Sequence, residues 1–203
     1  MSKNHLLAAV LFLSITLPYS VALADLNGAT SGAEQGEAVQ DAQDAEADRR
    51  LLEQFRAAQL SLTQAIEVAE GLHRGSRAAA AAFELSDSAA YRVITVKSGE
   101  AWENLIDANT GRVMGPELAS SLNEFERDER SNIVALGSVA QELSDAVRVA
   151  EKAAAGKAFG GGLMKQDGKL NFFVVVLSED ELKEVRLEPP KAGRKGSDRY
   201  QLH

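Results

Sequence analysis

The sequence contains no cysteine, and only one tryptophan and three histidines among its 203 residues. Without cysteine the protein can form no disulfide, no thiolate metal site and no cysteine nucleophile, and a lipid anchor on an N-terminal cysteine is excluded as well. His5 lies in the N-terminal segment and His203 is the last residue, so His73 is the only histidine expected in a folded region. Clustered histidine sites are thereby excluded, and we expect no metal and no cofactor.

Catalytic motifs are equally scarce. A Ser/His/Asp arrangement that uses His73 is arithmetically possible, but the sequence has no Gly-x-Ser-x-Gly turn to present the serine. We interpret His73 as a helix-end residue that interacts with the helix C-terminus. No catalytic residue is therefore assigned, and an enzyme is the least favoured class of protein.

One motif resembles the opening of a calcium-binding loop. Asp107, Asn109 and Gly111 have the required spacing, but Arg112 stands where the loop needs glycine and Leu118 where it needs a bidentate glutamate. A turn in which asparagine and glycine tolerate left-handed backbone explains these residues better.

Acidic residues outnumber basic ones, 30 against 22, and the formal net charge is −8. This balance argues against nucleic acid as a partner, because nucleic-acid binders present a basic face. Residues 25–48 carry seven acids, no base and little apolar content other than alanine, which predicts an acidic disordered spacer. Residues 189–203 combine two prolines with a cluster of bases and predict a basic disordered tail.

The N-terminal segment has the three-part layout of a cleaved secretion signal. A weakly basic start precedes an apolar run from Leu6 to Leu17, and Ala22 and Ala24 occupy the two positions that a signal peptidase recognises. The run is shorter than the roughly 20 residues that span a bilayer. We expect residues 1–24 to be a signal peptide cleaved after Ala24, which leaves a periplasmic or secreted protein without a membrane span.

Local signals predict a helix followed by three strands. Ser61 and Gln64 have the spacing of a capping box, and apolar positions recur at helical intervals from there to about His73. Alternating β-branched and aromatic residues then predict strands at 83–86, 91–97 and 102–106. The alanine run 78–82 intrinsically prefers helix, but we interpret it as the start of the first strand.

The strongest organisational signal is an internal repeat. Leu62–Glu70 aligns without a gap with Leu143–Glu151 at a constant offset of 81 residues, and Gly75 falls on Gly156. Strand-like runs follow the second helix in the same order, at 157–164, 170–177 and 182–187. One such unit would be marginally stable alone, whereas two can share a core.

These signals predict an α+β fold made of two repeats, each with a helix packed on a three-stranded antiparallel sheet. The first module spans residues 49–114 and the second spans residues 137–188. Residues 115–136 between them are predicted to form an extra linking helix, because Leu118, Leu122 and Phe125 would share one side of it.

The first module resembles the PepSY domain family. The resemblance rests on Leu62–Ala69, on the strand that contains Tyr91–Val93, and above all on the closing run Ile106–Val113 with its Asp-Ala-x-Thr-Gly-x-Val pattern. The second module is similar in its helix and strands, but Leu187–Pro190 replaces the closing pattern. The resemblance implies the α+β fold and a non-catalytic role, since PepSY domains resemble parts of peptidase propeptides and are proposed to inhibit or regulate local peptidases.

The resemblance assigns no contact residues, so candidates for a binding face come from residue type. Trp102, the only tryptophan, is the first candidate and Tyr91 is the second, because large aromatic residues are enriched in binding hot spots. The alternative is a core position, which is the commoner role of a single aromatic residue in such a sheet.

We therefore expect a non-catalytic binding or regulatory protein of the periplasm that modulates or inhibits an envelope peptidase through its PepSY-like modules. Its partner would be a protein or peptide of the envelope. The alternative is a structural or assembly factor of the cell envelope with no peptidase partner.

Overall fold

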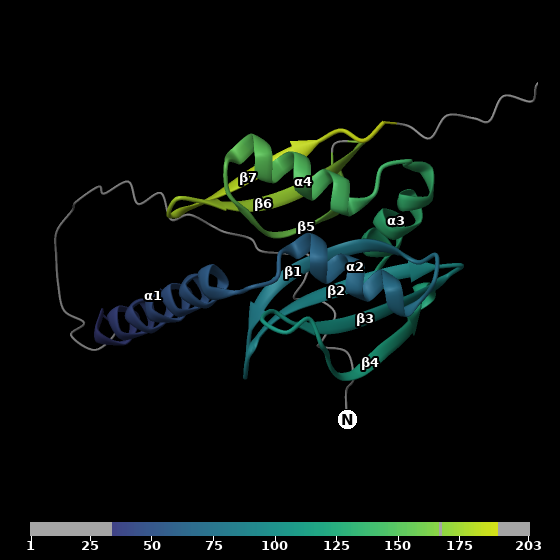
Figure 1. The fold of residues 1–203 in the computed structure, drawn as a ribbon. Coiled ribbons are helices and arrows are strands. Elements are labelled where there is room, and N and C mark those ends of the chain that lie inside the picture. The colour runs from purple at the N-terminus through teal and green to yellow at the C-terminus, as the bar shows by residue number, and fades with distance from the viewer. Residues whose placement is uncertain (1–33, 167, 191–203) are drawn as a thin grey trace, which may run out of the picture.

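A single seven-stranded antiparallel sheet organises the chain, in the order β4-β3-β2-β1-β5-β6-β7 (Figure 1). The computed structural model describes residues 34–166 and 168–190, so the predicted signal peptide with Ala24 and most of the basic tail lie outside the described residues. The elements are α1 (Glu34–Ala57), α2 (Leu62–Leu72), β1 (Arg77–Leu85), β2 (Ala89–Lys97), β3 (Glu100–Asp107), β4 (Val113–Ser121), η1 (Leu122–Glu124), α3 (Arg127–Ala135), η2 (Leu136–Ser138), α4 (Leu143–Ala154), β5 (Lys157–Gln166), β6 (Lys169–Ser178) and β7 (Glu181–Leu187).

Helices α2 and α4 lie side by side against the sheet, which gives the α+β fold predicted from the sequence (Figure 1). Helix α2 covers β1, β2 and β3, and α4 covers β5, β6 and β7. The two helices contact each other, and Arg148 Nη2 of α4 lies 3.1 Å from Glu67 Oε1 of α2. Among the helices of the described residues, none is long and apolar enough to cross a bilayer.

The start of α2 confirms the predicted capping box. Ser61 Oγ accepts a hydrogen bond from the backbone N–H of Gln64 at 3.2 Å, and Gln64 Oε1 accepts one from the N–H of Ser61 at 2.9 Å. Two backbone donors that the helix itself leaves unpaired are thus satisfied. This start fixes where the apolar face of α2 meets the sheet.

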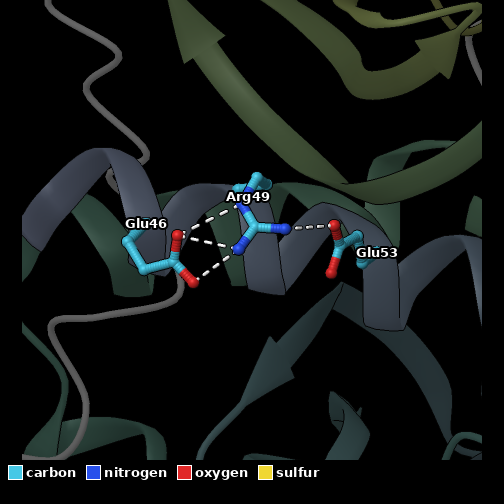
Figure 2. Close-up of polar contacts among 3 residues, drawn as sticks. All are labelled: Glu46, Arg49 and Glu53. Carbon is cyan, nitrogen blue, oxygen red and sulfur yellow. Dashed lines mark hydrogen bonds and ion pairs between the residues drawn. The ribbon is translucent and has the colours of Figure 1, made fainter.

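Helix α1 begins at Glu34 and so contradicts the disorder predicted for the later part of residues 25–48. Alanine, glutamate and glutamine favour helix even where little surface is buried. Figure 2 shows Arg49 between two acids of this helix: its guanidinium lies 2.6 Å from Glu46 and 2.7 Å from Glu53, one turn away on either side. Such pairs at three- and four-residue spacing stabilise an exposed helix by about 0.2–0.5 kcal/mol each.

Strand β4 and the short 3-10 helix η1 replace the first half of the predicted linking helix, so the prediction of an α-helix from residue 115 to 136 is wrong as far as residue 126. Residues 113–121 pair with β3, from Val113 opposite Ile106 to Ser121 opposite Glu100. Gly115 has a φ of +65°, and Pro116 follows it, a combination that breaks a helix. The helix in this region, α3, is confined to Arg127–Ala135, and the first module has four strands instead of three.

The centre of the sheet is built from small residues. Ala80, Ala81 and Ala82 of β1 lie opposite Gly162, Gly161 and Gly160 of β5, and these three pairs join the two halves of the sheet. The alanine run thus forms a strand, as predicted, because it has strands on both sides. A Cβ atom at Gly161 would lie 2.9 Å from the carbonyl oxygen of Phe173, so β5 admits no side chain there.

Corresponding contacts occur in the two halves at the junction of helix and first strand. Glu70 of α2 accepts a hydrogen bond from the backbone N–H of Ala78 at 2.7 Å. Glu151 of α4 accepts one from the N–H of Ala158 at 2.9 Å. Each helix is thus tied by a glutamate near its end to the strand that follows it.

The first strand of each half, β1 and β5, begins with a cationic residue whose side chain contacts the other half of the fold. Arg77 donates to the carbonyl oxygens of Leu136 and Val139, at 2.9 and 3.1 Å, in the segment that precedes α4. Lys157 donates to those of Phe55 and Ala58, at 3.1 and 2.7 Å, in the segment that precedes α2. Burial lowers the pKa of Lys157. The two halves are therefore braced reciprocally.

Candidate functional site

A partly exposed aromatic surface lies where the end of α2 meets β3 and β4. Trp102 of β3 is half-buried, and its indole ring stacks on the imidazole of His73, with the ring centroids 4.0 Å apart and the planes 13° from parallel. Nε2 of His73 lies 2.7 Å from Oε2 of Glu117 on β4. We call these three residues and Asn104 of β3 the edge cluster.

Asn104 anchors the edge cluster to the sheet. Its side chain is 1% exposed, and Nδ2 donates a hydrogen bond to Glu117 Oε2 at 3.1 Å. The same carboxylate oxygen thus contacts both Asn104 and His73, while Oδ1 of Asn104 has no partner within the part of the chain that the structure describes. The irregularity between Glu103 and Leu105 in the pairing of β3 with β4 falls at this asparagine.

The geometry of the edge cluster is better suited to binding a partner than to catalysing a reaction. An imidazole that is held by a carboxylate on one side and stacked on an indole presents a flat, orientated aromatic surface. Across residues 34–166 and 168–190, no three histidine, aspartate or glutamate side chains come together as a metal site would require. His73 ends α2, as predicted, but it contacts Glu117 and Trp102 through its side chain.

Tyr91, the second candidate from the sequence, lies in the core. Its side chain is 0% exposed, and its hydroxyl donates a hydrogen bond to the carbonyl oxygen of Leu60 at 2.9 Å. Burial raises its pKa strongly. In this structure its side chain is therefore not on the surface, and Trp102 alone of the two candidates can contact a partner.

The closing turn after β3 uses Asp107 as a backbone acceptor. Its Oδ1 accepts hydrogen bonds from the N–H groups of Asn109 and Thr110, at 2.9 and 2.7 Å, and from the Thr110 hydroxyl at 3.0 Å. Gly111 adopts a φ of +71°. The turn also reaches back to the chain before α2, because Leu60 N–H donates to the carbonyl oxygen of Ala108 at 2.9 Å. The carboxylate therefore organises a turn where the sequence predicts one, with Gly111 but not Asn109 in the left-handed region.

Because of this turn, the free energy of unfolding should depend on pH in the acidic range. The backbone N–H groups of Thr110 and Asn109, together with the Thr110 hydroxyl, lower the pKa of Asp107. A carboxyl whose pKa is lower in the folded state contributes stability above its unfolded pKa, near 3.9, and loses it as the pH falls through the folded pKa. We expect urea unfolding to show a steeper loss of stability below about pH 4 for the wild type than for Asp107→Asn.

The control for this prediction is Asp87→Asn, which removes one exposed acid from the turn between β1 and β2. Its stability curve should run parallel to that of the wild type. Identical acid slopes for the wild type and Asp107→Asn would contradict the role given to the Asp107 turn.

The sequence model of the PepSY family, described as "Peptidase propeptide and YPEB domain", matches residues 59–115. This chain carries a PepSY domain. The matched segment begins just before α2, includes β1, β2 and β3, and ends two residues beyond the start of β4. The PepSY domain therefore contains Trp102, Asn104 and His73, whereas Glu117 lies two residues past its end.

Comparison with other proteins adds little to the PepSY match. No curated protein matches the sequence. A solved structure titled "putative lipoprotein" from Clostridium difficile 630 is similar over 67% of this chain and 92% of that chain, at 14% identity and a TM-score of 0.37. A TM-score that low carries no argument about function.

The sequence singles out Trp102 and His73 separately, but it predicts neither their contact nor the roles of Asn104 and Glu117. Asn104 belongs to no motif, and Glu117 fell within the predicted linking helix, where it would have been an exposed charge. The adjacent Gly115 and Pro116 were the signal that could have placed Glu117 on a strand, because the pair is poorly compatible with a helix interior.

Proposed function

We propose that this protein is a non-catalytic binding protein of the cell envelope that modulates an envelope peptidase through its PepSY domain. The observation that carries the proposal is the match of residues 59–115 to a family described by peptidase propeptides. A propeptide acts on a peptidase by contact, and it needs a folded surface and no reactive group of its own. The edge cluster, which is partly exposed and orientated by hydrogen bonds, supplies such a surface.

Export is the second part of the proposal. The apolar run and the small residues before Ala24 support a cleaved signal, and a peptidase partner would then be one that shares the compartment. The absence of cysteine is compatible with an oxidising compartment, because the fold depends on burial and not on disulfides.

We also infer that residues 137–188 are a second copy of the module. Three observations support this inference: the offset of 81 residues between α2 and α4, the matching ties at Glu70 and Glu151, and the reciprocal cations Arg77 and Lys157. The second copy would complete a core that both modules share. The PepSY domain, residues 59–115, would make the contact with the partner.

The test uses the mature chain, residues 25–203, purified and immobilised. An envelope extract of the source bacterium is passed over it, bound peptidases are identified by mass spectrometry, and their activity on casein is measured with and without the free protein. We expect a peptidase to be captured and its rate of casein hydrolysis to change in proportion to the bound fraction.

An unrelated acidic protein of similar size and net charge serves as the control for electrostatic capture. If no peptidase binds above this control and casein hydrolysis in the extract is unaffected, the proposed function is wrong. Capture of envelope proteins other than peptidases, without an effect on proteolysis, would instead favour a structural or assembly role.

A further inference from the structure

The two outer strands of the sheet differ in how they are protected. Strand β7 carries four charged side chains, all of them exposed: Glu181, Lys183, Glu184 and Arg186. Charged residues, lysine above all, block the addition of another strand to a sheet edge. Strand β4, at the opposite edge, carries one charge, Glu117, whose carboxylate is bound by His73 and Asn104. By this criterion β4 is the open edge.

Exposed apolar residues also gather at β4. The described residues include five large hydrophobic side chains that are exposed. Two of them, Val113 and Leu118, lie on β4, and a third, Leu72, ends α2 next to His73 in the sequence. Isolated exposed hydrophobics need no explanation, but several beside an unpaired strand make a surface that another chain can cover.

The backbone of β4 has unpaired groups that face outward. Leu122 N–H donates to the carbonyl oxygen of Gly99 at 3.1 Å, which fixes the alternation of the β3–β4 ladder. In an antiparallel pair every second residue bonds to the partner strand, so Ser120 and Leu118 face β3. The N–H and C=O groups of Glu117, Ala119 and Ser121 therefore point away from the sheet.

Charge indicates what could add to this edge. Between Glu100 and Glu124 the chain carries five acidic residues and one basic residue, Arg112. An acidic segment would be repelled there, and a basic one attracted. Gly115 and Pro116 interrupt the strand at its start, so a regular ladder is open only from Glu117 to Ser121.

We propose that the edge from Glu117 to Ser121 binds an extended segment of the partner peptidase as an added strand. This segment carries apolar residues at alternate positions, which lie on one face of the sheet and pack on Leu118. The basic residues between them lie on the other face, beside Trp102 and Glu117. The inference rests on the function proposed above, and it names the surface and the chemistry of the partner segment. Backbone hydrogen bonds supply the affinity in this mode of recognition, and side chains supply the preference.

The critical variant is Ala119→Pro. It removes one outward N–H group without removing a hydrogen bond between β3 and β4, since Ala119 lies opposite Trp102 at a position that does not bond to β3. A second variant, Leu118→Lys, places on β4 the kind of residue that protects β7. The matched control is Val149→Lys on α4, because Val149 and Leu118 are equally exposed, at 48% and 47%.

The probe is a synthetic seven-residue peptide of alternating valine and lysine, compared with the corresponding peptide of valine and glutamate. Trp102 is the only tryptophan, so its emission reports on the adjoining edge. We expect the lysine peptide to shift this emission. Both β4 variants should weaken binding of the lysine peptide about tenfold or more, because they remove one or two hydrogen bonds and a side-chain contact. Val149→Lys should bind within about twofold of the wild type.

The same variants are then tested for their effect on casein hydrolysis by the captured peptidase. Loss of the effect in Ala119→Pro, with an unchanged circular dichroism spectrum and melting temperature, is the expected result. If the wild type modulates the peptidase and Ala119→Pro does so equally well, the inference about the edge fails while the proposed function stands. The inference about the edge also fails if the lysine peptide binds equally to all variants or does not bind at all. It fails as well if the wild type is a dimer that Ala119→Pro dissociates, because the added strand would then come from a second copy of this chain.

Discussion

Replacement of Arg92 by methionine is expected to lower the free energy of unfolding by about 3 kcal/mol at pH 7, because breaking a buried ion pair leaves charge without compensation. Arg92 of β2 lies between two carboxylates on neighbouring strands. Its Nε lies 2.6 Å from Glu84 on β1, and its Nη1 contacts Glu103 on β3. Glu103 is 8% exposed, so solvent cannot replace the lost cation.

The size of this effect should depend on pH. Burial raises the pKa of Glu103 despite the opposing effect of Arg92. A carboxyl with a raised folded-state pKa contributes stability below its unfolded pKa, and that contribution is lost as the pH rises through the folded value. Without Arg92 the pKa of Glu103 would rise further. The difference in free energy of unfolding between the wild type and Arg92→Met should therefore become smaller as the pH is lowered from 7 towards about 5.

Two variants control for this prediction in urea unfolding experiments. Arg148 also contacts two carboxylates, but its side chain is 53% exposed, so Arg148→Met should cost less than about 0.5 kcal/mol. The double variant Arg92→Met/Glu103→Leu should recover much of the loss, because it removes the uncompensated carboxylate. If Arg92→Met lowers the free energy of unfolding as little as Arg148→Met does, the buried ion pairs of Arg92 do not stabilise the fold.

Substitution of Gly156 by alanine should also cost about 3 kcal/mol, at the upper end of the range for overpacking. Gly156 joins α4 to β5, and a Cβ atom there would lie 2.2 Å from the carbonyl oxygen of Leu177 and 2.9 Å from Cγ1 of Val176. The nearest atom belongs to the backbone of β6, which cannot move without disturbing its pairing with β5 and β7. Thermal unfolding measured by circular dichroism should show the loss as a lower melting temperature.

Gly71 in the last turn of α2 provides the matched control. No atom lies within 4 Å of a Cβ built at this position, and its φ is not positive. Gly71→Ala should be neutral or stabilising by up to about 1 kcal/mol, because alanine favours helix. If Gly156→Ala left the melting temperature as high as Gly71→Ala does, the close approach of Gly156 to β6 would be refuted.

The features predicted correctly from the sequence are those that local residues determine. The Ser61–Gln64 cap lies within four residues, and the closing turn of Asp107 uses its own next three residues. The α+β class followed from helix and strand periodicities that agree with the structure. Even the alanine run of β1 was assigned correctly, because the alternating residues that follow it continue the same strand.

The features missed depend on pairing across the chain. Leu118, Leu122 and Phe125 have helical spacing, but the backbone of residues 113–121 gains hydrogen bonds by pairing with β3, and tertiary pairing outweighs local preference. Tyr91 is a candidate for binding by residue type alone, and residue type does not tell which face of a strand is covered. Asn104 and Glu117 could not be placed together without the register of β3 and β4. The edge cluster therefore depends on the topology: the sequence singles out Trp102 and His73, but not their contact with each other or with Glu117.

The contact between Glu67 and Arg148 joins residues 81 positions apart, which is the offset of the sequence repeat. The two side chains thus occupy the same place on their helices. In a symmetric dimer of one ancestral module, a residue at that place would face itself, glutamate against glutamate or arginine against arginine. If residues 137–188 are a second copy, as we propose above, fusion into one gene lets the two positions mutate separately. The opposite charges at this contact are a form of symmetry breaking that two identical subunits could not have reached.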